Sequence, residues 1–183
     1  MIESLDMHLQ DLVQNAYSAG ASRVSVLLDC DKAADRLTLE VSDNGSGMDE
    51  QTMRAVQQGF FSSKSKRSVG LGIPLLRASA EHCDGSFDIA SRPGAGTTVT
   101  ARFRLRHIDL PQLGNLAKTF LNILVTSSGR WVSITYRCGD QELDIDTNRL
   151  HEFLGETSFQ HPEVIRFLRS YIEEHIGQEW EET

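Results

Sequence analysis

Three polar side chains recur at helical spacing near the start of the chain. Asp11, Asn15 and Ser18 stand at positions i, i+4 and i+7, so a helix would place them on one face. A solvated helix surface explains a single Asp/Asn pair, but asparagine is a poor helix former that usually occurs at caps. An interior Asn15 therefore favours a ligand role. Its amide oxygen suits Mg²⁺, which takes few protein ligands, and Asp11 could orient or deprotonate a water.

The stretch "VSDNGSGMDE", residues 41–50, sets a carboxylate, an amide and two glycines at the end of an alternating strand. Asn-Gly is typical of a hairpin turn, but the following "MDEQTMRAVQQ" has helical periodicity, which excludes a hairpin. Asp43, followed by Gly45 and Gly47, instead indicates a carboxylate facing a pocket floored by bare backbone. A buried carboxylate accepts a hydrogen bond from an exocyclic amine, and such a site rejects a base that lacks the amine. The pattern favours adenine over guanine.

Two further glycine segments carry weaker signals. In "VGLGIPLL", Gly70 and Gly72 precede a helix whose free N–H groups and dipole favour an anion, although many such loops only turn the chain. "GAGTTV" is a glycine turn into a strand and is structural when taken alone. No Walker-type motif occurs, and the order of elements lacks the alternating parallel pattern of a dinucleotide fold. Any phosphate loop is therefore of another kind.

The elements that must position these residues can be read from periodicity. We predict helices over 4–19, 49–57 and 74–83, and strands over 23–29, 36–42, 86–92 and 96–105. Asp49 is a natural N-cap for the second helix. The stretch "QGFFSSKSKRSVGLG" has no period, so we predict a mobile loop there. These elements form a first unit, residues 1–106, with a sheet of at least four strands.

Residues 107–183 read as a second, weaker α+β unit. It contains a helical segment over 110–128, a hairpin over 130–146 that turns at Gly139 and Asp140, and a helical stripe over 164–172. We expect this C-terminal extension to serve dimerisation or partner binding, and we expect the chemistry to lie in the loops of the first unit.

Composition excludes several classes of protein. The chain has 183 residues, 39% of them hydrophobic, and a net charge of −8, which makes a nucleic-acid or acidic-membrane surface improbable. Its three cysteines are far apart and lack zinc-type spacing, so we expect reduced, buried thiols. No apolar run reaches membrane-spanning length, and the first residues are acidic and amphipathic. We expect a cytoplasmic protein.

Taken in order, five segments resemble the N, G1, F, G2 and G3 boxes of the GHKL superfamily of ATP-binding domains, found in gyrase subunits, heat-shock chaperones, mismatch-repair ATPases and sensor histidine kinases. The segments are "DLVQNA", "DNGSGM", "GFFSSK", "VGLGIPLL" and "GAGTTV", and they cover about residues 5–105. The resemblance implies an α+β fold, a two-layer α/β sandwich of the Bergerat type with a mixed sheet and helices on one face. It also implies ATP with Mg²⁺ between the helix layer and a lid.

Residue roles follow from the resemblance by position. It implies Asn15 as the Mg²⁺ ligand through its side-chain amide, Asp43 as the acceptor for the adenine amine, and a set of nucleotide contacts. That set comprises Gly45, Gly47 and Met48 at the base, Phe60 with Phe61 in the lid, Gly70, Leu71 and Gly72 at the phosphates, and Thr97 or Thr98 near the adenine. Lys64 could reach the terminal phosphate, and a flexible basic loop is an equal alternative there.

Departures from the superfamily pattern point to one branch. Gyrase-like and chaperone ATPases carry Glu as the water-activating base where this chain has the shorter Asp11, which places hydrolysis in doubt. They also carry Asp where this chain has Ser18. The short lid and the "GLGIP" segment are closer to histidine kinases and anti-sigma kinases. The chain also resembles stand-alone ATP-binding proteins encoded near iron-only hydrogenase genes.

Two functions from different classes remain open. The first is a protein kinase of histidine or anti-sigma serine type that acts on an acceptor in trans, because sensor kinases carry the acceptor His ahead of the ATP domain and this sequence starts within it. His151 with Glu152 is a weak candidate acceptor. The second is a nucleotide-sensing interaction module in which ATP closes the lid without chemistry. A slow GHKL ATPase ranks third.

Overall fold

The computed structural model describes residues 4–58, 72–127, 129–155 and 157–176. In chain order its elements are α1 (Leu5–Ser18), β1 (Arg23–Asp31), β2 (Arg36–Asp43), α2 (Glu50–Gln58), α3 (Gly72–His82), β3 (Ser86–Arg92), β4 (Gly96–Arg104), α4 (Leu116–Thr126), β5 (Trp131–Cys138), β6 (Gln141–Asp146), α5 (Thr147–Leu154) and α6 (Pro162–His175).

All six strands form one mixed sheet in the order β3-β4-β2-β1-β5-β6. Neighbouring strands are antiparallel except β1 and β5, which pair in parallel from Arg23 opposite Trp131 to Cys30 opposite Cys138. The sheet is open, with β3 and β6 at its edges. The predicted α+β class and mixed sheet are confirmed.

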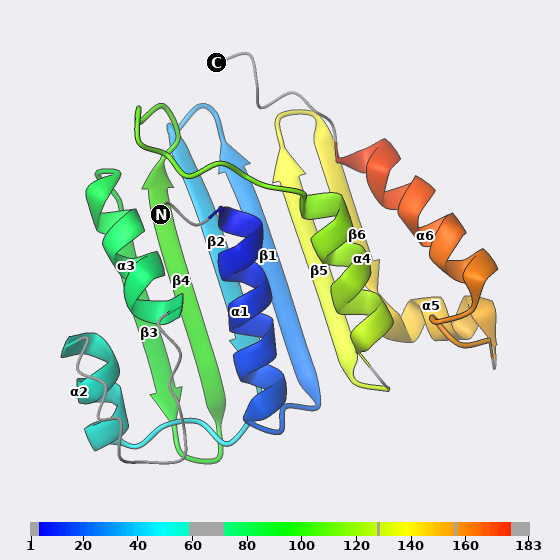
Figure 1. Ribbon diagram of the computed structural model, residues 1–183, viewed down its shortest axis with the longest axis horizontal. Helices are drawn as coiled ribbons and strands as arrows, with labels where there is room; N and C mark the ends of the chain where they lie inside the picture. Colours follow the sequence, from blue (N-terminus) through cyan, green and yellow to red (C-terminus); the bar gives the residue numbers. More distant parts are fainter. Residues whose placement is uncertain (1–3, 59–71, 128, 156, 177–183) are drawn as a thin grey trace.

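Helices α1, α3 and α4 lie over the same face of the sheet (Figure 1). Strands β1 and β2 alternate between buried and half-exposed residues, so every second side chain points into the layer between sheet and helices. Leu9 of α1, Val26 of β1 and Leu39 of β2 are nearly inaccessible there. The other face carries polar pairs such as Thr100 with Glu40 (2.9 Å), as expected for a largely antiparallel sheet with one solvated face.

Most elements of the first unit match the sequence prediction. The predicted cap is present, because the backbone N–H of Thr52 donates to Asp49 Oδ1 at 2.7 Å at the start of α2. The sequence reading missed α5, which is short and buries only Thr147 among its residues. The predicted loop over residues 58–72 lies almost entirely outside the described residues. Its aromatic residues, Phe60 and Phe61, lie outside them as well.

A crossover segment, residues 105–115, leads from β4 to α4 (Figure 1). It is held at α1, where the N–H groups of Leu5 and Asp6 donate to the carbonyls of Gln112 (2.8 Å) and Leu113 (3.0 Å). At the other end of its path the thiol of Cys83 donates to the Asp109 carbonyl at 3.2 Å. From α4 the chain enters β5, which joins residues 107–183 to the same sheet as the first unit.

The three cysteines are free and buried, as predicted. Cys30 and Cys138 face each other across the β1–β5 pair, and burial, followed by the neighbouring Cys138, raises the pKa of the Cys30 thiol to about 12. Among the helices of the described ranges, none combines the length and apolar character needed to cross a membrane.

Candidate active site: a recess along helix α1

One face of α1 connects two glycine segments that are far apart in the sequence. Asp11, Asn15 and Ala19 follow one another at intervals of four residues, so they lie in a row along the helix. At one end of this row, a Cβ added to Gly72 at the start of α3 would lie 2.7 Å from Asp11 Oδ2. At the other end, a Cβ on Gly45 would lie 2.9 Å from the Cβ and carbonyl oxygen of Ala19. Asn15 stands between the two contacts, and we call this face of α1, bounded by Gly45 and Gly72, the recess.

The Asn15 side chain is half-buried in this row. Nearby backbone contacts are regular, since the Ala19 N–H donates to the Asn15 carbonyl at 2.9 Å. No hydrogen bond of the Asn15 side-chain amide is present within the part of the chain that the structure describes. Its amide oxygen is therefore available as a hard neutral ligand.

Asp43 ends β2 on the side of the sheet that the helices cover, because it follows buried Val41 by two residues. Its Oδ1 accepts a hydrogen bond from the backbone N–H of Gly45 at 2.7 Å. Burial raises the pKa of the Asp43 carboxyl, and hydrogen bonds from the backbone of Gly45 and Thr97 oppose the rise. The carboxylate is thus a partly desolvated acceptor held in place by backbone donors.

The loop after β2 requires glycine for close backbone packing. Gly47 has φ +63°, and a Cβ there would lie 1.9 Å from the carbonyl oxygen of Arg92 in the β3–β4 turn. The N–H of Gly94 donates to the Ser46 carbonyl at 2.7 Å, and the N–H of Met48 donates to Ser91 Oγ at 2.8 Å. The loop therefore rests directly on the turn between β3 and β4, with bare backbone beside Asp43.

Asn44, although adjacent to Asp43, has a structural role. Its Oδ1 accepts from the N–H groups of Ser22 (2.9 Å) and Arg23 (2.7 Å), and its Nδ2 donates to Ser22 Oγ (3.0 Å). These bonds tie the end of β2 to the start of β1. The side-chain oxygen of Asn44 therefore accepts two hydrogen bonds within the fold.

The two threonines named from sequence face opposite sides of the sheet. Thr97 pairs with Asp43 across β2 and β4 and stands in the same row as Ser91 of β3. Thr98 pairs with Ser42, and their hydroxyls are hydrogen-bonded at 2.8 Å on the open face. Thr97 is therefore the threonine beside Asp43.

Several site residues predicted from the sequence lie outside the described residues. They are Phe60, Phe61, Lys64, Gly70 and Leu71. Gly72 is buried at the first position of α3, where the free N–H groups of a helix point outward.

One contributor was missed by sequence reasoning. Ser91 bonds both to Met48 and to Thr97 (Oγ–Oγ1 2.9 Å), yet it carries no motif. A signal was available in principle, because Ser91 is the strand residue that pairs with Thr97 once the β3–β4 register is known.

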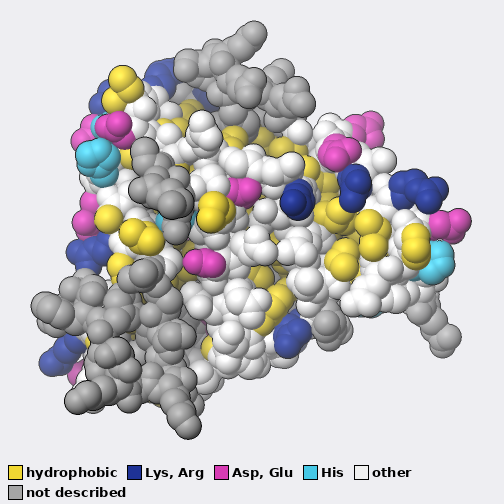
Figure 2. Space-filling view, viewed as in Figure 1, with side chains coloured by type: hydrophobic (Ala, Val, Ile, Leu, Met, Phe, Trp, Pro, Cys, Tyr) yellow, Lys and Arg dark blue, Asp and Glu magenta, His cyan; other side chains and the backbone are white. Residues whose placement is uncertain are grey.

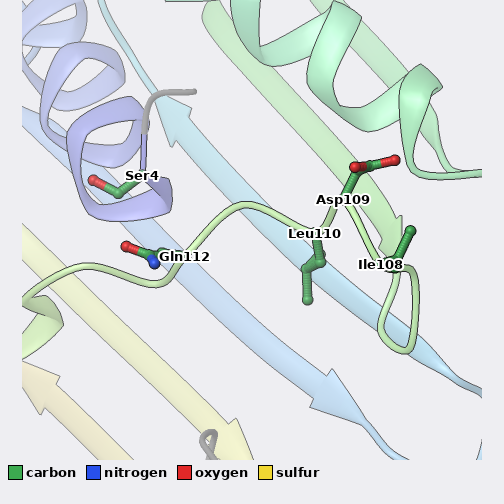
Figure 3. A pocket seen from close by; sticks show the side chains of 5 residues that line it. All are labelled: Ser4, Ile108, Asp109, Leu110 and Gln112. Carbon is green, nitrogen blue, oxygen red and sulfur yellow. The ribbon is translucent and has the colours of Figure 1, made fainter. Parts of the chain in front are cut away.

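A separate pocket of about 410 Å³ lies at the other end of α1 (Figure 3). It is lined by Ser4, Ile108, Asp109, Leu110 and Gln112, from the start of α1 and the crossover segment. Asn15 and Ala19 belong to the opposite end of the helix, so this pocket is not part of the recess.

The recess has a carboxylate and bare backbone at one end and the start of a helix at the other. Between them lies the Asn15 amide, which has no side-chain hydrogen bond to any described residue. An elongated ligand that offers hydrogen-bond donors at one end and negative charge at the other would match this arrangement. A mixed sheet covered on one face by helices, with such a recess along the first helix, is the Bergerat type of ATP-binding fold.

Comparison with known proteins identifies the family of this chain. A family model described as "Histidine kinase-, DNA gyrase B-, and HSP90-like ATPase" matches residues 2–107. The chain belongs to this family. Membership implies ATP binding of the histidine kinase type, and it agrees with the superfamily resemblance read from the sequence boxes.

Two relatives illustrate the branch. The chain is 34% identical over 106 residues to "Sensor histidine kinase YxdK" of Bacillus subtilis (strain 168), covering 54% of this chain and 32% of that protein. It is 38% identical over 90 residues to "Sensor protein kinase FleS" of Pseudomonas aeruginosa, covering 49% of this chain and 22% of that protein. The chain thus spans about a third or less of the length of these relatives.

A solved structure shares the fold. The "Crystal Structure of N terminal domain of a DNA repair protein" superposes with a TM-score of 0.51 at 14% identity, covering 78% of this chain and 51% of that chain. At this identity the likeness concerns the fold alone.

Proposed function

We propose that the recess along α1 binds Mg·ATP, with the adenine at Asp43 and the metal at Asn15. The observation that carries this proposal is the half-buried carboxylate of Asp43 beside bare backbone at Gly45, at one end of a helix face that reaches the start of α3 at its other end.

Adenine recognition rests on the acceptor character of Asp43. The Gly45 and Thr97 backbone groups already donate to this carboxylate, and its remaining lone pairs can accept from an exocyclic amine. A 6-oxo purine would present an acceptor to the same group and leave both unpaired, which costs about 1–3 kcal/mol. The site should therefore prefer ATP to GTP. Gly45, Gly47 and Met48 would contact the base edge.

Metal binding rests on the Asn15 amide. The oxygen of a half-buried amide without a partner in the described chain is a fitting ligand for Mg²⁺, which keeps several waters and binds phosphate oxygens. Bound Mg²⁺ would neutralise phosphate charge. Gly72 at the start of α3, together with Gly70 and Leu71 from the sequence prediction, would hold the phosphates, and Lys64 would reach the terminal one.

The activity that we propose is phosphoryl transfer to a separate protein. Support comes from the family model over residues 2–107 and from the two relatives, whose names describe a sensor histidine kinase and a sensor protein kinase. In such a step the terminal phosphoryl group passes from ATP to a nucleophilic side chain of the acceptor, and ADP leaves. Residues 107–183 would bind the partner or a second copy of this chain.

A nucleotide-sensing module is the second candidate, and the residue type at Asp11 favours it. Asp11 stands near the start of α3, its Oδ2 2.7 Å from the place a Cβ on Gly72 would take. It is one methylene shorter than the Glu that activates water in the gyrase-like and chaperone ATPases, so it reaches less far toward a water. Binding without turnover would follow, and slow hydrolysis ranks third.

Incubation with γ-labelled ATP and a cell extract separates these functions. Label on another protein supports the kinase, bound and unconsumed ATP supports the sensor, and released phosphate supports the ATPase. The Asn15→Ala variant serves as the matched control, because it should lose all three signals together. A chain that retains no ATP under any condition would contradict the proposal.

A further inference from the structure

Ser91, the residue before the last of β3, makes three hydrogen bonds through one hydroxyl. Its Oγ accepts from the backbone N–H of Met48 at 2.8 Å. It donates to the carbonyl oxygen of Gly96 at 2.9 Å. It also lies 2.9 Å from Thr97 Oγ1. One side chain thus joins the loop after β2 to the first residues of β4.

Proton counting fixes the direction of the third bond. A serine hydroxyl has one proton to donate and two lone pairs that accept. Ser91 gives its proton to Gly96, and Met48 occupies one lone pair. The remaining lone pair can only accept, so the Thr97 hydroxyl must donate to Ser91. The opposite direction would require a second proton on Ser91 Oγ.

This direction sets what Thr97 can offer to a ligand. With its single proton committed to Ser91, Thr97 Oγ1 keeps only acceptor capacity. Thr97 pairs directly with Asp43 across the strands, and its backbone also bonds to the Asp43 carboxylate. Two acceptors, the Asp43 carboxylate and the Thr97 hydroxyl oxygen, therefore belong to one row on the same face of the sheet, at the end of the recess.

We propose that Ser91 is a positioning residue for base selection: by accepting the Thr97 proton it keeps Thr97 an acceptor, so that the site favours a 6-amino purine over a 6-oxo purine. The proposal rests on the nucleotide site proposed above. An amine has two protons and can satisfy both acceptors, whereas a carbonyl oxygen would face two acceptors and be rejected. Ser91 itself touches neither base nor phosphate and acts through Thr97.

The chain supplies a matched control for this hydroxyl pair. Ser42 of β2 and Thr98 of β4 form a second Ser–Thr hydroxyl pair at 2.8 Å, in the row next to that of Thr97 and across the other neighbour of β4. They lie on the open face of the sheet, away from Asp43. Removing the Ser42 hydroxyl perturbs the strands to a similar degree without changing the protons at Thr97.

The test is the ratio of affinities for ATP and inosine triphosphate, measured by calorimetry with Mg²⁺ on the full chain. These nucleotides differ at the C6 substituent and the adjacent ring nitrogen. Wild type should prefer ATP. In Ser91→Ala the Thr97 hydroxyl is free to rotate and donate to a C6 oxygen, so the ratio should fall about three- to tenfold, the value of one hydrogen bond. Ser91→Thr keeps a hydroxyl and should restore the ratio, and Ser42→Ala should leave it unchanged.

The outcomes separate this inference from the function on which it rests. A merely structural role for Ser91, through Met48, would weaken both nucleotides equally and leave the ratio constant, which overturns the inference. A fall of the same size in Ser42→Ala also overturns it. Wild type that binds neither nucleotide, or binds both equally, overturns the proposed adenine site and this inference together.

Discussion

At the scale of single residues, the proposed nucleotide binding depends on a few groups whose environment differs from that of their neighbours. Asp43 and Asn44 are adjacent, but one is an acceptor with a raised pKa facing the recess and the other is consumed by bonds to Ser22 and Arg23. Sequence spacing identifies both as candidates. The structure is needed to distinguish the binding role of Asp43 from the structural role of Asn44, because the roles depend on where the strands end and how they pair.

Replacing Asp43 with Asn should weaken ATP binding by about 1–3 kcal/mol, because the amide nitrogen would meet the adenine amine donor to donor. Calorimetry on the folded variant measures this loss. Asp29→Asn, on the solvated face of β1, is the matched control and should bind like wild type. Equal affinities of the wild type for ATP and GTP would refute the assigned role of Asp43.

Asp43 should also give the ligand-free protein a characteristic pH dependence. Because burial raises the pKa of this carboxyl above 3.8, the folded state favours the protonated form. Its contribution to the free energy of unfolding is therefore largest below the ordinary pKa and falls as the pH rises through the raised one. The difference in unfolding free energy between wild type and Asp43→Asn should decrease as the pH rises from 3.8 through the raised pKa, and it should stay constant above that pKa.

Urea unfolding at a series of pH values measures that difference. A difference that increases with pH would mean that the pKa of Asp43 is lowered, and the carboxylate would then be satisfied by the protein rather than poised for a ligand.

At the scale of elements, the loop after β2 is shaped by its contact with the β3–β4 turn. Gly47 and Gly94 both have positive φ, +63° and +74°. A Cβ on Gly47 would meet the Arg92 carbonyl, whereas one on Gly94 would meet nothing within 4 Å. The two glycines therefore separate conformational strain from close packing.

Gly94→Ala should cost about 1–2 kcal/mol of stability from the left-handed conformation alone. Gly47→Ala should cost about 1–3 kcal/mol more than this, because the loop must also move away from the turn. Thermal and urea unfolding of the two variants measure the two losses of stability. ATP affinity should fall only for Gly47→Ala. Equal losses in the two variants would show that the loop does not depend on this contact.

Sequence reasoning succeeded where an element has its own local pattern. The alternation in β1 and β2, the stripe of α1 and the Asp49 cap were all readable, and so was the turn at Gly139 in the hairpin. It missed α5, which buries a single residue. It also missed the part of Ser91, because a serine near a strand end has no signature until the register of β3 with β4 is known.

At the scale of the whole molecule, the parallel pair of β1 and β5 joins the two halves of the chain. This pairing has no local sequence pattern. The sequence analysis therefore predicts a sheet made within residues 1–106 and does not predict that β5 extends it. Val132, Ile134 and Tyr136 of β5 are fully buried, and the Tyr136 ring packs edge-on against Phe120 of α4 at 6.5 Å. The C-terminal half thus contributes core to the same layer.

A chain truncated after residue 106 should not fold as a stable monomer. It would expose the hydrogen-bonding edge of β1 and the side of α1 that packs on α4. Circular dichroism, thermal melting and sedimentation compare it with the full chain. A monomeric fragment with a cooperative melt would instead support two independently folding units, divided at residues 106 and 107.

The exposed side of the C-terminal half is the region that we propose for a partner. Hydrophobic side chains gather over α4 and α6 on the helix side (Figure 2). Phe153 of α5 and Phe167 of α6 are 79% and 52% exposed. Phe153→Ser should leave ATP affinity and stability unchanged within about 0.5 kcal/mol, since it is a surface substitution. In the labelling experiment, the same variant should reduce transfer to an acceptor if this surface binds it.

A crystal structure of the full chain with Mg²⁺ and a non-hydrolysable ATP analogue would test the proposed site most directly. We predict one nucleotide along α1, with its adenine amine within hydrogen-bonding distance of the Asp43 carboxylate and its metal bound to the Asn15 amide oxygen. A nucleotide bound elsewhere, or one that engages only one of these two side chains, would contradict this prediction.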